Sequence, residues 1–144
     1  MYTKNGKINF SKRDTWSLND TLRPIIAQGL LKFRECIDGS KGMPFSVIED
    51  CVDSGLIEWL QEDIGSISAE SWEVVEKYYL DCLDKMIYAF TEPQPELPCY
   101  AKGQLKDSEV KAIFKEYREV MIEYNKRVQE GTELFGKYYH TLWW

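Results

Sequence analysis

The sequence predicts an all-α protein, a small helical bundle with three principal helices. Two observations indicate this class. Apolar residues recur at steps of three and four along three long stretches, which is the period of one helix face. In addition, 44% of the 144 residues are hydrophobic and 14% are aromatic, which is enough to bury a core. We expect helices near residues 18–36, 69–91 and 107–141, with one or two short helices between them, in an antiparallel or orthogonal bundle.

The N-terminal region predicts a polar arm followed by the first helix. Residues 1–15 are polar and basic, and we interpret them as a loosely held, flexible arm with a short extended piece at residues 7–10. Residues 16–144 then form a single helical domain. Ser17 begins a run of residues that can cap the first turn of a helix. A start at Asn19 or Asp20 would limit the loss of helix stability caused by Pro24, which has no backbone N–H to donate.

The middle of the chain is harder to interpret. Residues 43–67 suggest one or two short helices, interrupted at Ser54 and Gly55, that pack across the main bundle. Ser68 is a candidate cap for the next long helix, whose apolar stripe runs to Phe90. Three prolines in residues 91–98 exclude a helix there and predict a stiff, extended connector. The connector matches a Pro-x-x-Pro ligand pattern, but this match is weak.

The last helix gives the strongest signal in the chain. Its apolar positions alternate in steps of four and three: Val110, Phe114, Tyr117, Met121, Tyr124, Val128, Gly131, Phe135, Tyr138 and Leu142. This seam is typical of a helix packed along a partner helix. Asp107 or Ser108 would cap it. An unbroken helix over residues 107–141 would be about 50 Å long, against roughly 40 Å for a compact domain of this size.

The length of this helix leaves two alternatives. Either it breaks at Gly131, with Gly136 as the second choice, or it overhangs its own domain and another chain covers the overhang. A glycine on the seam would also allow another backbone to approach closely.

The composition argues against several kinds of chemistry. The formal net charge is −6, from 24 acidic and 18 basic residues, which is the wrong sign for gripping nucleic acid. There is a single histidine, His140, and no metal-ligand spacing or glycine-rich phosphate loop. The carboxylate pairs Asp81 with Asp84 and Glu73 with Glu76 favour a solvated helix face over acid–base catalysis. We therefore expect no enzyme, no metal and no cofactor.

The search for targeting signals and the spacing of the cysteines bear on the expected compartment. We find neither an apolar leader nor a membrane span in the sequence, and the four cysteines show no Cys-x-x-Cys pair. We expect four reduced cysteines and a cytoplasmic location, without contact to a membrane.

Two groups of residues are candidates for binding. The C-terminal end gathers large apolar and amphipathic side chains, which either cap the core or form an interface with a host protein or with another copy: Phe135, Tyr138, Tyr139, Leu142, Trp143 and Trp144. The second group would hold a nucleotide, with aromatic rings on its base and arginines on its phosphates: Tyr78, Tyr79, Arg23, Arg34, Arg118 and Arg127. Tyr138 or Trp143 could supply a further ring.

Three blocks of the sequence resemble a family of short bacteriophage-encoded helical proteins. They are the run from Trp16 through Ser-Leu-Asn-Asp, the Leu-Asp-Lys-Met-Ile run from Leu83, and the Leu-Phe-Gly-Lys-Tyr-Tyr-His-Thr-Leu-Trp run from Leu134 to Trp143. The resemblance implies a phage or prophage gene expressed in a bacterial host cytosol, and it brings no activity with it.

Three hypotheses about function follow. The first is a non-enzymatic binding protein that inhibits a host component, such as a defence or nucleic-acid enzyme, by protein–protein contact. The second is a protein that sequesters a small nucleotide signal. The third is an oligomeric virion or assembly component, for which the seam of the last helix would build a homo-oligomer.

Overall fold

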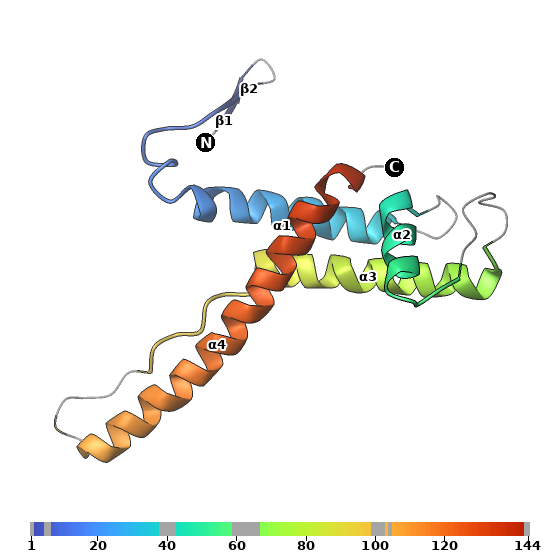
Figure 1. Ribbon diagram of the computed structural model, residues 1–144. Coiled ribbons are helices and arrows are strands. Elements are labelled where there is room, and N and C mark those ends of the chain that lie inside the picture. The colour runs from blue at the N-terminus through green and yellow to red at the C-terminus, as the bar shows by residue number, and fades with distance from the viewer. Residues whose placement is uncertain are drawn as a thin grey trace.

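The computed structural model describes residues 2–4, 7–37, 43–58, 67–98, 103 and 105–142, with side chains from residue 7 onward. In these ranges the chain forms helices α1 (Leu18–Cys36), α2 (Phe45–Asp53), α3 (Ala69–Thr91) and α4 (Asp107–Tyr138), followed by a 3₁₀ helix, η3 (Tyr139–Thr141). The helices pack on one another (Figure 1), and the predicted all-α fold is therefore confirmed.

Helix α3 is the centre of the bundle. Helix α1 lies antiparallel beside it, α2 packs across it, and α4 crosses it obliquely (Figure 1). The apolar faces of these helices meet in one core, as the step pattern predicts. The most deeply buried side chains are Val47, Cys51, Val75, Tyr79, Leu83, Met86 and Tyr138.

The short helix and the connector also agree with the sequence. Helix α2 ends at Asp53, and Gly55 follows with φ = 72°, a left-handed conformation that suits glycine. Helix α3 ends at Thr91, and residues 92–98 are extended and non-helical. The part of the predicted segment at residues 59–66 lies outside the described residues.

The helix starts agree only in part with the predicted caps. The Oγ of Ser68 accepts a hydrogen bond from the backbone N–H of Ser71 at 3.1 Å, so the predicted cap of α3 is confirmed. Helix α1 spans Leu18–Cys36, the range predicted for it. Because it starts before Asn19 and Asp20, Pro24 lies in its second turn. Ser17 occupies the cap position of α1, and its side chain makes no capping bond within the described residues.

The cap of α4 differs from the prediction. Lys106 is the cap residue, not Asp107 or Ser108. The carboxylate of Glu109 accepts from the backbone N–H of Lys106 at 2.7 Å. This bond provides half of a capping box, and so a serine or aspartate cap is not needed.

The N-terminal arm contains a small hairpin. Strand β1 (Tyr2–Lys4) pairs antiparallel with strand β2 (Lys7–Asn9). The predicted extended piece at residues 7–10 is thus confirmed over β2, whereas its pairing with residues 2–4 was not predicted. Two strands of three residues leave the fold class unchanged.

Helix α4 is continuous through both glycines at which a break was considered. Its 32 residues make it about 48 Å long. Gly131 lies where α4 crosses α3, and a Cβ at this position would collide with the carbonyl oxygen of Lys85 and lie 2.7 Å from the Cβ of Ala89. Of the two alternatives, the break is therefore excluded, and the close approach of another backbone at Gly131 is confirmed.

Two further findings concern the cysteines and the possibility of a membrane-spanning helix. Cys36, Cys51 and Cys82 carry free thiols, and Cys99 lies outside the described residues. Within the described ranges, no helix has both the length and the apolar character that crossing a membrane requires.

Candidate binding surface

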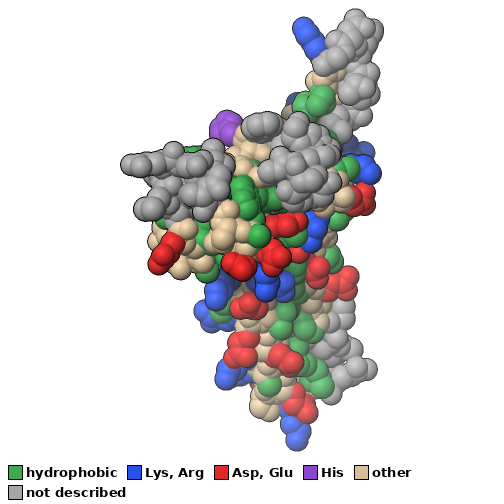
Figure 2. All heavy atoms as spheres, turned by 90° about the vertical axis from the view of Figure 1, so that its right-hand side faces the viewer, with side chains coloured by type: hydrophobic (Ala, Val, Ile, Leu, Met, Phe, Trp, Pro, Cys, Tyr) green, Lys and Arg blue, Asp and Glu red, His purple; other side chains and the backbone are tan. Residues whose placement is uncertain are grey.

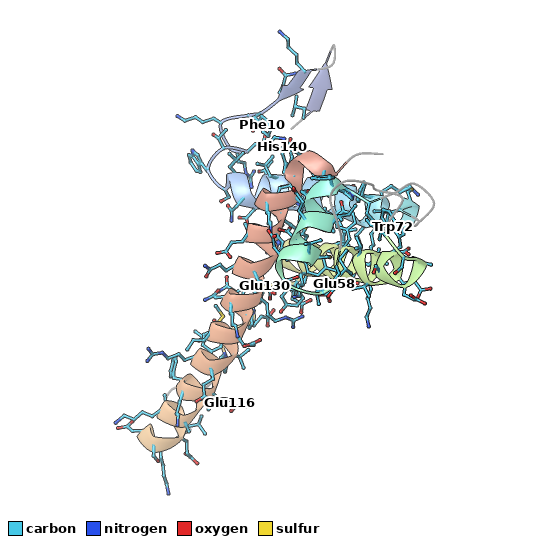
Figure 3. All side chains as sticks on the ribbon, turned by 45° about the vertical axis from the view of Figure 1, so that its right-hand side comes forward. Phe10, Glu58, Trp72, Glu116, Glu130 and His140 are labelled. Atoms are coloured by element: carbon cyan, nitrogen blue, oxygen red, sulfur yellow. The ribbon has the colours of Figure 1, made fainter. Side chains whose placement is uncertain are left out.

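The first half of α4 projects away from the bundle. We call residues 107–124 of α4 the overhang. Just beyond it, the guanidinium of Arg127 lies 3.6 Å above the ring centre of Tyr88 of α3. Figure 1 shows the overhang leaving the other helices, and Figure 3 labels Glu116 along it and Glu130 at the crossing. The predicted overhang is thus present.

The connector lies along the overhang. We call residues 92–98 the strap. The Tyr124 hydroxyl donates to the carbonyl oxygen of Glu92 at 3.3 Å, and the Tyr117 hydroxyl donates to that of Pro95 at 3.4 Å. A segment of the same chain therefore covers part of the seam, which one of the two alternatives assigned to another chain. Tyrosine suits this contact because its ring packs while its hydroxyl reaches a carbonyl.

Arg23 of α1 ties the strap to the bundle. Its Nε donates to the carbonyl oxygen of Phe90 at 3.1 Å, and its Nη2 donates to that of Glu92. The last carbonyls of a helix lack partners within the helix and carry partial negative charge. A guanidinium satisfies both needs at the end of α3 and fixes the direction in which the strap leaves.

A groove of about 470 Å³ lies between the strap and the overhang. Its apolar surface comes from the rings of Pro93 and Pro95, from Val120, and from the rings of Tyr88 and Tyr124. Three carboxylates, Glu92, Glu119 and Glu123, and the guanidinium of Arg127 complete its lining. Figure 2 shows hydrophobic side chains along the overhang with charged side chains beside them.

Exposed apolar side chains occur on two sides of the overhang. Val120, in the groove, is 48% exposed, and Leu97 of the strap is 54% exposed. Ile122 is 59% exposed, but two residues along a helix turn it about 200° away from Val120. Val120 therefore lies in the groove between the strap and the overhang, whereas Ile122 points to the opposite side of α4.

The predicted C-terminal interface residues have separate positions. Tyr138 is fully buried in the core, and Phe135 packs its ring against that of Phe90 with 5.1 Å between centroids. Tyr139 is 59% exposed, whereas Leu142 is partly buried. Trp143 and Trp144 lie outside the described residues. Of the group, Tyr139 is the described side chain most open to a partner.

Beside these residues lies a second, smaller groove of about 260 Å³, between α1 and the C-terminal end of α4. It is lined by Ile26, Gly29, Leu30, Phe33, Phe135 and Leu142.

The buried hydroxyl of Tyr138 belongs to a polar cluster that docks α2 onto α4. It donates to Oδ2 of Asp50, whose Oδ1 pairs with Nζ of Lys137 at 2.7 Å. The Tyr78 hydroxyl lies 3.5 Å from that of Tyr138. Burial and the donated bond raise the pKa of Tyr138 far above its usual value, and the bond to Asp50 raises the pKa of Lys137. Tyr138 and Lys137 therefore keep their protons at neutral pH, and the cluster acts as a structural clamp.

The candidate nucleotide residues are spread over the molecule. Arg23 holds the strap, Arg34 pairs with Asp84 at 3.0 Å, and Arg127 stacks on Tyr88. Arg118 lies on the overhang, and Tyr79 is buried in the core, where its hydroxyl has no hydrogen bond among the described residues. The structure does not bring these arginines to one tyrosine pair.

The carboxylate pairs lie on one open face of α3. Together with Arg34, Lys77 and Leu80 they line a hollow of about 420 Å³, and Lys85 pairs with Asp81 at 3.3 Å. Within the described ranges, no group of three or more acidic, histidine or cysteine residues is placed to hold a metal ion. His140 is exposed, and its ring contacts that of Tyr139.

The sequence reasoning missed the groove. Val120 lies just beside the seam and was not singled out, and the prolines of the strap were interpreted as a connector only. The signal that was present is an apolar residue next to a complete seam, since Val120 widens the apolar face of α4 beyond the stripe that one partner helix needs. Comparisons with known proteins found no matching family model, no matching curated protein and no matching solved structure.

Proposed function

We propose that this protein acts by binding another protein, with the overhang and the strap as its contact surface. The observation that carries the proposal is that α4 leaves its own bundle while exposing Val120 in a groove walled by the strap. A helix that served only the core would not need this length. Exposed apolar hollows of this kind are typical of interaction sites.

As a narrower proposal, the partner is a component of a bacterial host, such as a defence or nucleic-acid enzyme that the protein inhibits. Two features of the sequence support this. The chain resembles phage-encoded proteins, and its net charge of −6 suits the occupation of a basic surface. Nucleic acid itself would be repelled by this charge.

Self-association is a second candidate, because the regular seam of α4 is typical of helices that pair with copies of themselves. It predicts a mass in solution that is a multiple of the chain mass of 16.9 kDa. Light scattering on the purified protein measures this mass directly.

The test of the contact function compares two matched variants. Val120→Asp places a charge in the groove, and Ile122→Asp makes the same kind of change on the other side of the helix. Both side chains are exposed, so both variants are expected to fold, which circular dichroism checks. Tagged wild-type protein and both variants are incubated with bacterial lysate, and captured proteins are quantified by mass spectrometry.

We expect a set of captured proteins that wild type and Ile122→Asp share and that Val120→Asp loses at least about tenfold. Identical profiles for all three proteins would overturn the proposed contact surface. The same samples, denatured and analysed for released small molecules, would reveal a bound nucleotide if the sequestering hypothesis were correct.

A further inference from the structure

The groove between strap and overhang combines an apolar floor with an acidic rim. Val120 and the two proline rings form the floor, and the carboxylates of Glu119 and Glu123 stand beside Val120 on α4. Within the described part of the chain neither carboxylate takes part in an ion pair. The guanidinium of Arg127 is engaged with the ring of Tyr88. The rim therefore offers negative charge to an incoming partner.

The acidic edge extends along the helix. Glu109, Glu116, Glu123 and Glu130 follow one another at intervals of seven residues, which places them on the same side of α4. Lys85 of α3 pairs with Glu130 at 2.8 Å and so neutralises the end nearest the bundle. Of the other three, Glu123 lines the groove, and the carboxylate of Glu109 accepts the capping bond from Lys106.

The strap cannot accept a partner by adding a strand. Pro93, Pro95 and Pro98 have no backbone N–H to donate. The carbonyl oxygens of Glu92 and Pro95 already accept from Tyr124 and Tyr117. The N–H of Glu92 donates to Tyr88, so only Gln94, Glu96 and Leu97 have an N–H left to offer. The groove therefore suits a partner that presents side chains better than one that adds a strand. An α-helix does so at positions i, i+3, i+4 and i+7 of one face.

From these observations, and resting on the contact function proposed above, we infer that the groove binds an amphipathic helix of a partner protein whose apolar stripe is flanked by lysines or arginines. The apolar stripe contacts Val120, Pro93 and Pro95, and the basic flank faces Glu119 and Glu123. Because the charges are exposed at the rim, they contribute mainly to specificity and to the rate of association, and salt weakens them.

The test uses three synthetic fluorescent peptides about five helical turns long. All three are titrated with the full-length protein by fluorescence anisotropy. The first has a leucine stripe flanked by lysines, and the second replaces the lysines with glutamates. The third has the composition of the first in an order that forms no stripe, and it controls for simple attraction between a basic peptide and an acidic protein.

We expect only the first peptide to bind measurably, with an affinity that falls between about 50 mM and about 500 mM salt. Val120→Asp abolishes binding, whereas Ile122→Asp leaves it unchanged. The double variant Glu119→Gln with Glu123→Gln weakens binding about tenfold and reduces its dependence on salt.

Several results would overturn the inference. Equal binding of the lysine and glutamate peptides would show that charge plays no part, and equal binding of the unordered peptide would show that the stripe plays none. Equal loss in Val120→Asp and Ile122→Asp would place binding elsewhere. A dimer that Val120→Asp dissociates would show that a second copy fills the groove. If no peptide binds while Val120→Asp still loses captured proteins, the contact function stands and the helical basic partner is wrong.

Discussion

Replacing Gly131 with alanine tests whether α3 and α4 can cross this closely only because residue 131 has no side chain. The added Cβ would lie 2.7 Å from the Cβ of Ala89 and would also collide with the carbonyl oxygen of Lys85. A backbone carbonyl cannot rotate away as a flexible side chain can, so the two helices must separate. Overpacking of this kind destabilises a protein by about 1–3 kcal/mol.

The expected magnitude follows from two opposing effects. Alanine is favoured over glycine inside a helix by about 1 kcal/mol. A clash near the upper end of the overpacking range therefore leaves Gly131→Ala about 2 kcal/mol less stable than wild type. Gly136→Ala is the matched control, since it lies in the same helix with no atom within 4 Å of the added Cβ. It should gain up to about 1 kcal/mol.

Urea unfolding followed by circular dichroism measures both variants. The free energies of unfolding of the two variants should differ by about 3 kcal/mol, which corresponds to roughly 6–12 °C in melting temperature for a chain of this size. The reasoning fails if Gly131→Ala is as stable as Gly136→Ala, because the helices would then have room for a side chain at their crossing.

Three further predictions concern the contacts that hold the strap and the core. Arg23→Ala should lose about 1–3 kcal/mol and expose the bond after Glu96 to a glutamate-specific protease, since the bonds to Phe90 and Glu92 disappear. Tyr138→Phe should lose about 1–3 kcal/mol, because the partly buried Asp50 carboxylate loses a donor. Burial raises the pKa of the Cys51 thiol to about 11, from 9.0. The folded state therefore holds this proton more tightly than the unfolded state, so the stability that the thiol contributes is complete below pH 9 and is lost as the pH rises toward 11.

Each of these predictions has its own control. Arg34→Ala removes only an exposed ion pair with Asp84 and should change stability by less than about 1 kcal/mol; equal proteolysis in both arginine variants would contradict the role of Arg23. Tyr139→Phe should be neutral because its side chain is exposed. For the thiol, unfolding is measured at pH 8 and near pH 10.5. Wild type should lose about 2 kcal/mol more than Cys51→Ala over this interval, and parallel losses would refute the assignment.

The sequence predicted the helices well because each has a local cause. Steps of three and four mark the buried faces of α1, α3 and α4, a serine caps α3, and Gly55 follows the end of α2. These signals act within a few residues. The cap of α4, which differs from the prediction, also has a local reason, since α4 uses the side chain of Glu109 where a cap residue with an oxygen acceptor was expected.

Contacts between distant residues could not be predicted in the same way. Arg23 contacts the end of α3 across 67 residues of sequence, and Asp50 reaches Tyr138 across 88. Both pairs depend on how the helices cross. Nothing in the neighbouring sequence distinguishes Arg23 from another arginine on α1. For this reason Arg23 and Tyr138 were candidates for binding. In the structure, Arg23 holds the strap and Tyr138 docks α2 onto α4.

The seam of α4 shows where such reasoning ends. A regular repeat identifies the side of a helix that is covered, but it does not identify what covers it. In this protein the cover changes along one stripe: the strap receives the hydroxyls of Tyr117 and Tyr124, and α3 then packs against Gly131. Because the strap is a narrow segment and not a helix, it covers part of the stripe without covering its border. Val120 is left in a groove on that border. A single charge placed there should therefore disrupt the proposed contact surface and leave the fold intact.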